Sequence, residues 1–345
     1  MQTLRIGIVG LGGNARLRHV PGLRACPGVE IAGVCNRTPR STRDAAAAFG
    51  IPHVYDDWRE LASDPQLDAV VVGTWPSLHC EVAVHALEAG KHVLTEARMA
   101  RDEHEARRML EASRRHPQLV AQIVPSPFGL RVHRVVLQLL ADGFLGRLQE
   151  VVVLGVVDAL ADPAAPRHWR QSRRDSGLNM LALGILHETL TRWLPQPRRV
   201  YAQGNVFTPL RPDPHSGAPA PVEIPDALHV LAEWTDGARG LYHLSNVAHF
   251  GAGMQIRLYG SEGTLQLEFG DEERLLGGRR GDAGLRSLSI PDELAGRWRV
   301  EEEFIGAIRG REPVRFTDFA TGVRYMEFTA AVARSLAARQ PQDVP

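Results

Sequence analysis

Apolar and polar residues alternate along the first 124 positions in a pattern typical of a parallel α/β sheet. Short apolar runs, several of them rich in valine, are separated by stretches in which apolar residues recur at helical spacing. Because parallel strands need a crossover connection, this alternation indicates right-handed βαβ units. The strands are predicted at 4–9, 29–34, 53–55, 69–73, 92–95 and 119–124, and the helices at 41–49, 57–62, 81–89 and 102–115.

The pattern changes after residue 124, where runs of strand character become longer and follow one another closely. Asp236-Gly237 and 261–263 are typical hairpin turns between such runs. We therefore expect a parallel-sheet domain over 1–124 and a domain with a large, mostly antiparallel open sheet over 125–345. The strands are predicted at 149–157, 199–207, 228–235, 239–247, 254–259 and 264–269, and the helices at 131–142, 300–309 and 318–339.

Two further expectations concern the second domain. The stretch 208–225 is rich in proline and is predicted to be a surface loop. The C-terminal helices are expected to pack back on the first domain. Taken as a whole, the sequence predicts the α/β class, with a second domain of α+β type.

A glycine-rich turn follows the first predicted strand directly. Residues 10–15 read Gly-Leu-Gly-Gly-Asn-Ala, the G-x-G-x-x-A pattern of dinucleotide-binding folds. Gly10 permits the tight turn, Gly12 lets the backbone approach a pyrophosphate, and Ala15 allows close packing of helix on strand. Backbone N–H groups at the start of the next helix can bind the phosphates, so Gly13 and Asn14 are also expected to contact the nucleotide. The alternative is an ordinary glycine-rich βα turn.

The end of the second strand indicates which nucleotide is bound. An acidic side chain at this place binds a ribose 2′-hydroxyl, whereas a nearby arginine accommodates a 2′-phosphate. The chain has Asn36 and Arg37 here, with Arg40 close behind, and no carboxylate. The sequence therefore favours NADP(H) over NAD(H), with Arg37 and Arg40 on the phosphate and adenine. The alternative is that these arginines are solvated charges at a helix start.

Residues at the end of the fourth strand form a second candidate segment of the cofactor site. The carboxyl ends of parallel strands line the ligand crevice in such sheets. Thr74, Trp75 and Pro76 follow this strand and are expected to border the nicotinamide or its ribose. His79 belongs to the same segment, where a packing or capping role is the alternative to cofactor contact.

Composition and charge exclude several classes of protein. The 40 Lys and Arg residues balance the 40 Asp and Glu residues, so no basic surface for nucleic acid or anionic membrane is expected. Strand-like sequence begins by residue 4 and no apolar run reaches membrane-spanning length, so neither a signal peptide nor a membrane partner is expected. The three cysteines and the histidines show no metal-ligand spacing. These features together predict a cytoplasmic protein without a metal.

Several motifs together resemble the glucose–fructose oxidoreductase/inositol dehydrogenase (Gfo/Idh/MocA) family. The resemblance implies an N-terminal Rossmann domain, a C-terminal domain whose open sheet forms a homodimer or homotetramer interface, and NAD(P)-dependent conversion of sugars, inositols and related carbonyls. The implied substrate is a small sugar or polyol, or an acidic derivative if Arg98 and Arg170 contact it. The motifs are 10–15, Asn36-Arg37, Thr74 to His79, Leu87 to Leu94, Gly177 to Leu194 and Phe304 to Gly310.

The residues that the resemblance implies for proton transfer are replaced. Hydride transfer to or from a carbinol needs a group that takes or gives the hydroxyl proton. The family's Glu-Lys-Pro motif corresponds to Glu96, Ala97 and Arg98, so only the glutamate is retained, and Glu96 is also expected to contact the cofactor. The peptide before the proline is often cis in the family, and a cis bond before another residue is costly. Lys91 is the one lysine of the chain, so no other lysine can substitute.

The second half shows the same loss. The family pattern Asp-x-Gly-x-His-x-x-Asp falls on residues 182–189, where Ala182, Leu186 and Thr189 occupy the acidic and histidine positions. His187 follows one residue later. Since one residue turns a helical side chain by about 100°, His187 does not simply inherit the lost role.

Three hypotheses remain for the chemistry. In the first, the protein is an active oxidoreductase whose proton donor has moved to His187, Glu96, Arg98 or the cluster Arg167-His168-Trp169-Arg170. In the second, it binds NADP(H) and a small ligand without turnover, as a sensor or regulatory protein. In the third, it catalyses elimination or redox-neutral epimerisation with the nicotinamide as a transient hydride acceptor.

The segment His168-Trp169-Arg170 is the remaining candidate for substrate contact. It matches a tryptophan–arginine pair that the family carries near the substrate. Arg98 and Arg170 in one crevice would favour a substrate with a carboxylate or phosphate, because arginine binds such groups bidentately. His187 is included with these residues as a possible substrate contact.

Overall fold

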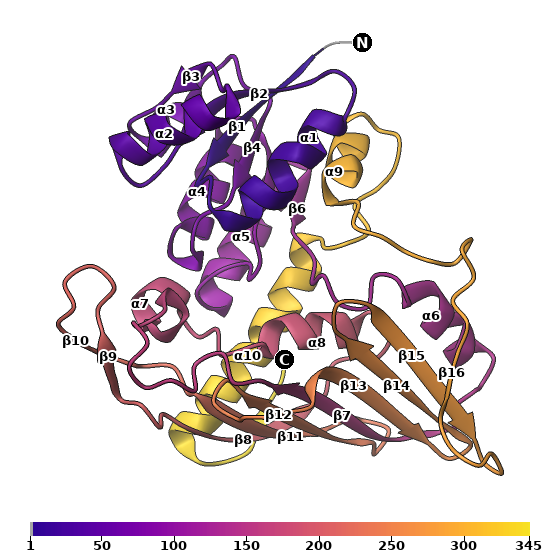
Figure 1. The fold of residues 1–345 in the computed structure, drawn as a ribbon. Coiled ribbons are helices and arrows are strands. Elements are labelled where there is room, and N and C mark those ends of the chain that lie inside the picture. The colour runs from indigo at the N-terminus through magenta and orange to yellow at the C-terminus, as the bar shows by residue number, and fades with distance from the viewer. Residues whose placement is uncertain (1–2) are drawn as a thin grey trace. The chain divides into compact units, whose positions relative to one another are not determined.

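The computed structural model describes residues 3–345, and the chain forms two compact units, each built around its own sheet (Figure 1). The first unit comprises residues up to Pro125 together with Arg299–Met326. The second comprises Ser126–Trp298 together with Glu327–Pro345. A segment close to the C-terminus therefore completes the unit that the N-terminus begins.

The first unit contains the predicted six-stranded parallel sheet, in the order β3-β2-β1-β4-β5-β6. All four residues of β4 are buried, since helices cover both faces of the sheet. This arrangement is the Rossmann topology that the alternation of strands and helices predicted. The strands are β1 (Leu4–Val9), β2 (Val29–Cys35), β3 (His53–Val54), β4 (Ala69–Val72), β5 (His92–Thr95) and β6 (Ala121–Ile123).

The helices of the first unit begin and end at residues with clear local signals. The Thr38 side chain accepts from Ser41 N–H to cap α2, and Gly50 ends that helix with a left-handed φ of 58°. Asp57 and Asp102 cap α3 and α5 in the same way. The helices are α1 (Val20–Ala25), α2 (Pro39–Phe49), α3 (Trp58–Ser63), α4 (Pro76–Glu88), α5 (Glu103–Arg115), α9 (Val300–Ile308) and the first part of α10 (Phe319–Ala338).

Two local features of this unit differ from the prediction. The chain after the glycine loop makes a π-helical turn, Ala15–His19, before α1 starts. Helix α4 begins five residues earlier than expected, because Pro76 occupies its first turn, where a missing N–H costs nothing.

The second unit is built on a nine-stranded sheet in the order β16-β15-β14-β13-β7-β12-β11-β8-β17. Strands β7 and β12 pair in parallel, and every other neighbouring pair is antiparallel, as the mostly antiparallel prediction requires. The strands are β7 (Leu148–Val156), β8 (Arg199–Asn205), β11 (Ala227–Glu233), β12 (Arg239–Ser245), β13 (Gly253–Gly260), β14 (Gly263–Phe269), β15 (Glu273–Arg279), β16 (Arg286–Ser287) and β17 (Gln342–Asp343).

The stretch 208–225 is not wholly a loop, which corrects the prediction. Strands β9 (Leu210–Pro212) and β10 (Pro219–Pro221) pair as a separate antiparallel ribbon. Prolines are tolerated here because a two-stranded ribbon consists of edge strands only. Strands β15, β16 and β17 were not predicted either; β15 carries two glycines, which weaken its strand pattern.

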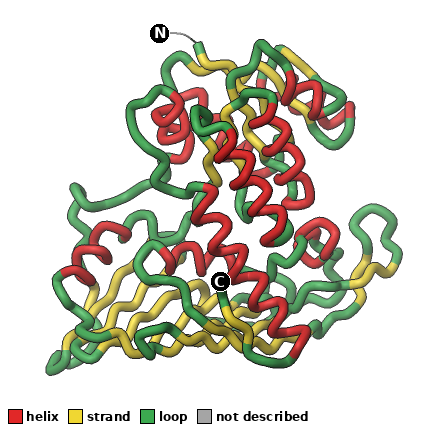
Figure 2. Tube along the Cα trace, turned by 180° about the vertical axis from the view of Figure 1, so that it is seen from behind, coloured by secondary structure: helices red, strands yellow, loops and turns green. Residues whose placement is uncertain are grey.

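One face of the nine-stranded sheet is covered and the other is bare. Helices α6 (His133–Ala141), α8 (Leu183–Thr191) and the second part of α10 lie on the covered face (Figures 1 and 2). The side chains that β7, β12, β11, β13 and β14 direct toward these helices form the core of the unit. A further short helix, α7 (Arg173–Ser176), lies in the connection between β7 and α8.

Within residues 3–345, no helix combines the length and apolar character that a membrane crossing needs. The same part of the chain contains no cluster of three or more His, Cys, Asp or Glu side chains positioned to hold a metal ion.

Candidate functional site

The glycine loop packs so tightly against the end of β4 that neither Gly10 in the loop nor Gly73 after the strand has room for a side chain. Gly10 has a φ of 86°, and a Cβ there would lie 2.8 Å from backbone atoms of Gly73 and Thr74. A Cβ on Gly73 would lie 2.3 Å from the Gly10 carbonyl oxygen. Gly12 differs, since its Cβ would meet only the Gly73 oxygen, at 3.6 Å. The space above Gly12 is therefore open to a ligand.

Asn36 shapes this loop from the end of β2. Its Oδ1 accepts from the Leu11 N–H (2.7 Å), and its Nδ2 donates to the Ser41 carbonyl (2.9 Å). Its own N–H donates to Thr42 Oγ1 (3.0 Å). The Asn36 side chain is thus occupied in holding the loop against the start of α2.

A cavity of about 440 Å³ opens above the glycine loop, at the carboxyl ends of β1, β2 and β4. Its size is typical of a small-molecule site. Arg16 and Arg37 contribute the charged groups, and none of the described lining residues is acidic. The residues that line it are Val9, Gly10, Leu11, Gly12, Gly13, Arg16, Cys35, Asn36, Arg37, Ser41, Trp58, Gly73, Thr74, Trp75, Ser77 and Leu78.

The predicted cofactor residues divide into those that line this cavity and those that do not. The Arg37 guanidinium lies 5.6 Å from the centre of the Trp75 ring, so the two side chains form one cation–π contact at the rim. Arg40 instead lies on the surface, 3.9 Å from Asp44. The other predicted residues outside the lining are Asn14, Ala15, Pro76, His79 and Glu96.

His79 is buried, and its ring contacts two backbone carbonyls instead of lining the cavity. Its two ring nitrogens lie 3.0 Å from the Thr74 carbonyl and 2.9 Å from the Arg98 carbonyl. Burial lowers the pKa of this imidazole. His79 therefore ties the end of β4 to the segment after β5, where the Ala97–Arg98 peptide is cis and Arg98 is largely buried.

Glu96, the retained residue of the Glu-Lys-Pro motif, belongs to a buried charged cluster. Its Oε1 lies 3.0 Å from His19 Nε2 and also accepts from the Asn14 amide. The other nitrogen of His19, Nδ1, lies 2.6 Å from Glu301 Oε1 on α9. Sequence reasoning missed His19 and Glu301; the visible signal was one histidine four residues after Ala15, without its distant partner.

The two carboxylates of this cluster determine whether His19 is protonated. Burial would lower the pKa of His19, but its hydrogen bonds to Glu301 and Glu96 outweigh burial and raise it to about 9. Burial would raise the pKa of Glu96, but the hydrogen bond and charge of His19 hold it below its usual range. At neutral pH the cluster is therefore an imidazolium between two carboxylates.

The structure places His187 in the hydrophobic core of the second unit. It is fully buried, its ring stacks on Phe328 at 3.5 Å, and its nitrogens bond Tyr242 Oη (2.9 Å) and Gln196 Oε1 (3.0 Å). Burial lowers its pKa to about 4. These contacts give His187 a packing role, and they correct the expectation that it faces a catalytic crevice.

The neighbouring positions of α8 also lack a group for proton transfer. Leu186 is fully buried in the same core, and Ala182 is the residue before the helix. The Thr189 hydroxyl donates to Ser126 Oγ at 2.8 Å. None of the three side chains titrates near neutral pH.

A buried ion pair on α8 fixes the beginning of the second unit. Arg192 lies 2.7 Å from Glu188, and both side chains are almost inaccessible to solvent. Arg192 also donates to the carbonyls of Ser126 and Phe128, each at 2.8 Å, while Glu188 accepts from the Ser126 N–H at 3.0 Å. This network was not predicted, and its geometry is structural.

The predicted substrate segment forms a short 3₁₀ helix, Trp169–Gln171. His168 is exposed and caps it, since its Nδ1 accepts from the Arg170 N–H at 3.2 Å. The exposed Arg170 guanidinium lies 4.1 Å from the centre of the Trp169 ring. Both side chains are therefore oriented by contacts within the segment.

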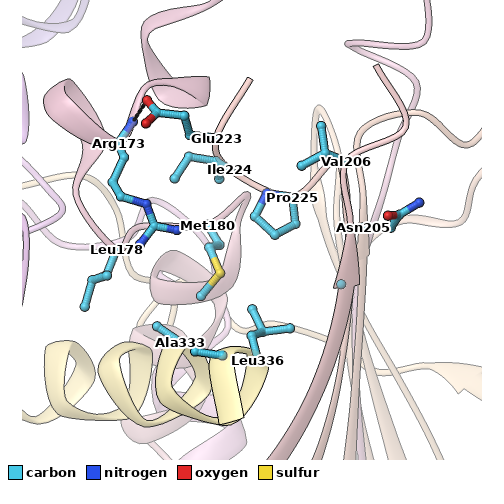
Figure 3. Close-up of a pocket in the computed structure, with 12 residues that line it drawn as sticks. Arg173, Leu178, Met180, Asn205, Val206, Glu223, Ile224, Pro225, Ala333 and Leu336 are labelled. Atoms are coloured by element: carbon cyan, nitrogen blue, oxygen red, sulfur yellow. Dashed lines mark hydrogen bonds between the residues drawn. The ribbon is translucent and has the colours of Figure 1, made fainter. Parts of the chain in front are cut away.

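A second cavity of about 440 Å³ lies in the second unit, between the end of β8, the segment around Met180 and α10 (Figure 3). Arg173 and Glu223 contribute its charged groups, and the Arg173 N–H donates to the Glu223 carboxylate at 3.0 Å. Figure 3 shows the Arg173 guanidinium beside Met180 and Leu178. Arg173 and Glu223 thus border a hollow whose other lining side chains are mostly apolar.

Comparison with known proteins agrees with this architecture. Residues 4–123 match the family described as "Oxidoreductase family, NAD-binding Rossmann fold", and residues 133–266 match the GFO/IDH/MocA C-terminal domain. The chain is 26% identical to levoglucosan dehydrogenase from Pseudarthrobacter phenanthrenivorans over 80% of its length and 76% of the relative. It is also 26% identical to myo-inositol 2-dehydrogenase from Thermotoga maritima, over 90% of each chain.

Solved structures show the same fold along the whole chain. Levoglucosan dehydrogenase in complex with NADH and L-sorbose superposes with a TM-score of 0.88 at 23% identity, covering all of both chains. An oxidoreductase domain protein from Kribbella flavida gives a TM-score of 0.87 at 25% identity, again over both full chains. The two domain matches cover most of the sequence, and the chain belongs to the Gfo/Idh/MocA oxidoreductase family.

Proposed function

We propose that the protein is an NADP(H)-dependent oxidoreductase that interconverts a hydroxyl and a carbonyl on a small sugar, polyol or acidic derivative. The cavity above the glycine loop carries this proposal, because it combines an open approach at Gly12 with two arginines and no described acidic residue. A nicotinamide held there would supply hydride transfer. Relatives that act on levoglucosan and myo-inositol support the substrate class.

The preference for a 2′-phosphate depends on Arg37 in this proposal. Arg37 lines the cavity and stacks on Trp75, whereas Arg40 points to the surface and pairs with Asp44. A guanidinium held by a ring is well placed to bind a phosphate, and no described carboxylate of the lining favours a free 2′-hydroxyl.

The Arg37→Ala variant is expected to lose the selectivity for NADPH. Wild type should bind NADPH at least about tenfold more tightly than NADH, since a charged hydrogen bond contributes about 1.5–3 kcal/mol. The variant should bind both nucleotides with similar affinity, as measured by nucleotide fluorescence titration. The Arg40→Ala variant is the matched control and should retain the selectivity. Tighter binding of NADH than of NADPH by wild type would contradict the assignment.

Glu96 is the residue to which we assign proton transfer. Its side chain is 14% exposed, and its Oε2 makes no hydrogen bond to any residue between 3 and 345, so one oxygen is left to accept from a ligand hydroxyl. Lys91 cannot serve, because it is buried and its Nζ donates to the Leu67 carbonyl at 2.6 Å. Arg98 does not deprotonate near neutral pH.

The test is a comparison of NADPH binding and turnover in wild type and Glu96→Gln. The substrate panel contains sugars, sugar acids and inositols. Glu96→Gln is expected to lower kcat at least about 100-fold, within the range that general acid–base catalysis contributes, while still binding NADPH. Equal turnover by the variant would exclude Glu96 as the proton-transfer group.

A catalytically silent NADP(H)-binding protein is the second candidate function. The observation that favours it is the loss of titratable side chains at Ala97, Leu186 and Thr189 together with the burial of His187. Tight NADPH binding by wild type without turnover on any panel member would support this alternative. Formation of an epimer or an elimination product without net change in NADPH would instead support redox-neutral chemistry.

We propose further that the bare face of the nine-stranded sheet joins copies of this chain. Leu231 and Leu241 are directly opposite on β11 and β12 and are 57% and 36% exposed. Leu241 also lies opposite Val152 on β7, so the three side chains form one apolar strip. Such a strip on an uncovered sheet face is typical of a subunit interface.

The double variant Leu231→Glu with Leu241→Glu is expected to be monomeric. Two buried charges without partners would cost far more than the apolar contacts they replace. Analytical ultracentrifugation should show a dimer or tetramer for wild type and a monomer for the variant, with unchanged circular dichroism. The control, Leu285→Glu, alters an exposed leucine outside the strip and should assemble as wild type does. A monomeric wild type would contradict the proposed interface.

A further inference from the structure

His19, Glu96, Glu301 and Asn14 connect three parts of the first unit that are distant in sequence. Asn14 belongs to the glycine loop, His19 ends the π-helical turn after it, Glu96 follows β5, and Glu301 lies in α9. The hydrogen bonds run from Asn14 to Glu96, from His19 Nε2 to the same Glu96 oxygen, and from His19 Nδ1 to Glu301. The loop that receives a pyrophosphate is thus joined through Glu96 to a buried imidazole.

The protonation state of His19 sets the net charge of the cluster, and burial strengthens the effect of that charge on its neighbours. The His19 side chain has no exposed surface, and that of Glu301 is 4% exposed. With His19 protonated, the three ionisable groups sum to one negative charge; with His19 neutral, they sum to two. Screening by water is weak at such a site, so this difference acts on any anion bound at the neighbouring loop.

The charged groups around His19 come from three directions. Glu96 faces it from the end of β5 and Glu301 from α9. Arg16 and Arg18 share its π-helical turn, and Arg16 Nε donates to the Leu11 carbonyl at 3.1 Å. The buried His79 is the other titratable group that acts on Glu96, and burial lowers its pKa.

Gly22 makes room for the Glu301 carboxylate. A Cβ at this position of α1 would lie 2.7–2.8 Å from three atoms of the Glu301 side chain. An alanine would therefore push the carboxylate away from His19 without changing any charge. This gives a way to disturb the cluster that is independent of its ionisable residues.

We infer that His19 is a positioning residue that acts through Glu96, and that its protonation couples the affinity for NADP(H) to pH. This inference rests on the proposed NADP(H) function. The imidazolium holds Glu96 in contact with Asn14 and offsets one of two carboxylates beside the phosphate-binding loop. Loss of its proton adds a negative charge there, and this charge repels the dinucleotide phosphates.

The test is a titration of the full-length protein with NADPH from pH 7 to 10.5, followed by fluorescence. This range lies above the second ionisation of the 2′-phosphate, near pH 6, so the ligand charge stays constant. Wild-type Kd is expected to be constant up to the region of pH 9, then to rise by about tenfold and level off, as loss of one linked proton with a tenfold effect on affinity requires. His19→Gln should bind about tenfold more weakly at pH 7.5 and show no rise.

Two further variants separate coupling from a merely structural role. Glu301→Gln and Gly22→Ala each weaken the contact that favours the imidazolium, so the rise in Kd should begin at least about one pH unit lower. Glu302→Gln, the neighbouring surface glutamate that pairs with Arg299, is the matched control and should behave as wild type. A structural role alone would change Kd by the same factor at every pH and leave the onset in place.

The outcomes distinguish this inference from the proposed function. A wild-type Kd that does not change with pH, or an onset that stays in place in Glu301→Gln and Gly22→Ala, would overturn the coupling and leave NADP(H) binding intact. Absence of NADPH binding at every pH would overturn the proposed function and the coupling together. A shifted onset in both variants, with an unshifted onset in Glu302→Gln, would support the coupling.

Discussion

The Gly12→Val variant is expected to fold like wild type and to bind NADPH at least about 100-fold more weakly, because the second glycine of the loop lets the backbone approach the pyrophosphate. A Cβ at Gly12 would meet only the Gly73 carbonyl oxygen, at 3.6 Å, which is an ordinary contact distance. The added methyl groups would instead occupy the space above the loop, where the ligand's phosphates would lie. Calorimetry with NADPH measures the affinity, and circular dichroism measures the fold.

Gly10→Ala gives the contrasting result that makes this prediction specific. Its Cβ would lie 2.8 Å from backbone atoms of Gly73 and Thr74, and the positive φ disfavours any side chain, so the fold itself should be destabilised. Gly270→Ala is the control, because nothing lies within 4 Å of its Cβ. If Gly12→Val binds NADPH as wild type does, the cavity above the loop is not the nucleotide site.

Arg192→Met is expected to lower the free energy of unfolding of the second unit by about 3–5 kcal/mol, the cost of breaking a buried ion pair on one side. The substitution keeps most of the apolar length of the side chain. It leaves the Glu188 carboxylate buried without its counter-charge and frees the carbonyls of Ser126 and Phe128 that Arg192 satisfies. Urea denaturation followed by near-ultraviolet circular dichroism measures the change.

Arg198→Met is the matched control for this prediction. Arg198 pairs with Glu233 at 2.7 Å, but half of its side chain is exposed, so its removal should cost less than about 1 kcal/mol. The Glu188→Gln, Arg192→Met double variant should recover part of the lost stability, because it removes the stranded charge. A loss below about 1 kcal/mol in Arg192→Met would show that the pair contributes no more than a surface pair does.

The first unit could be predicted in detail because its signals are local. The valine-rich β4 and the capping residue Thr38 each determine structure within a few positions, and the strands were predicted to within a few residues. The two-stranded ribbon at 208–225 could not be predicted, because its prolines indicate loop and its pairing depends on a partner within the same irregular stretch. The glycines of β15 hid that strand in the same way.

The candidate site shows the same difference between residues whose contacts are local in sequence and residues whose contacts are distant. The contacts of the glycine loop follow from its own residues, so Gly10 and Gly12 could be assigned from sequence. Whether His187 faces a crevice or the core depends on Tyr242 and Phe328, which lie on other elements. The pairing of His19 with Glu301 spans 282 residues and has no sequence signal of its own.

That separation has a consequence for biosynthesis. During translation His19 emerges about 15–55 seconds before Glu301, at ribosomal rates of about 5–20 residues per second. Until then the imidazole lacks one of its two carboxylates, and α9 and the beginning of α10 are missing from the unit that the N-terminus started. The nascent nucleotide-binding unit therefore waits for nearly the whole polypeptide, and a chain terminated before α9 releases it incomplete.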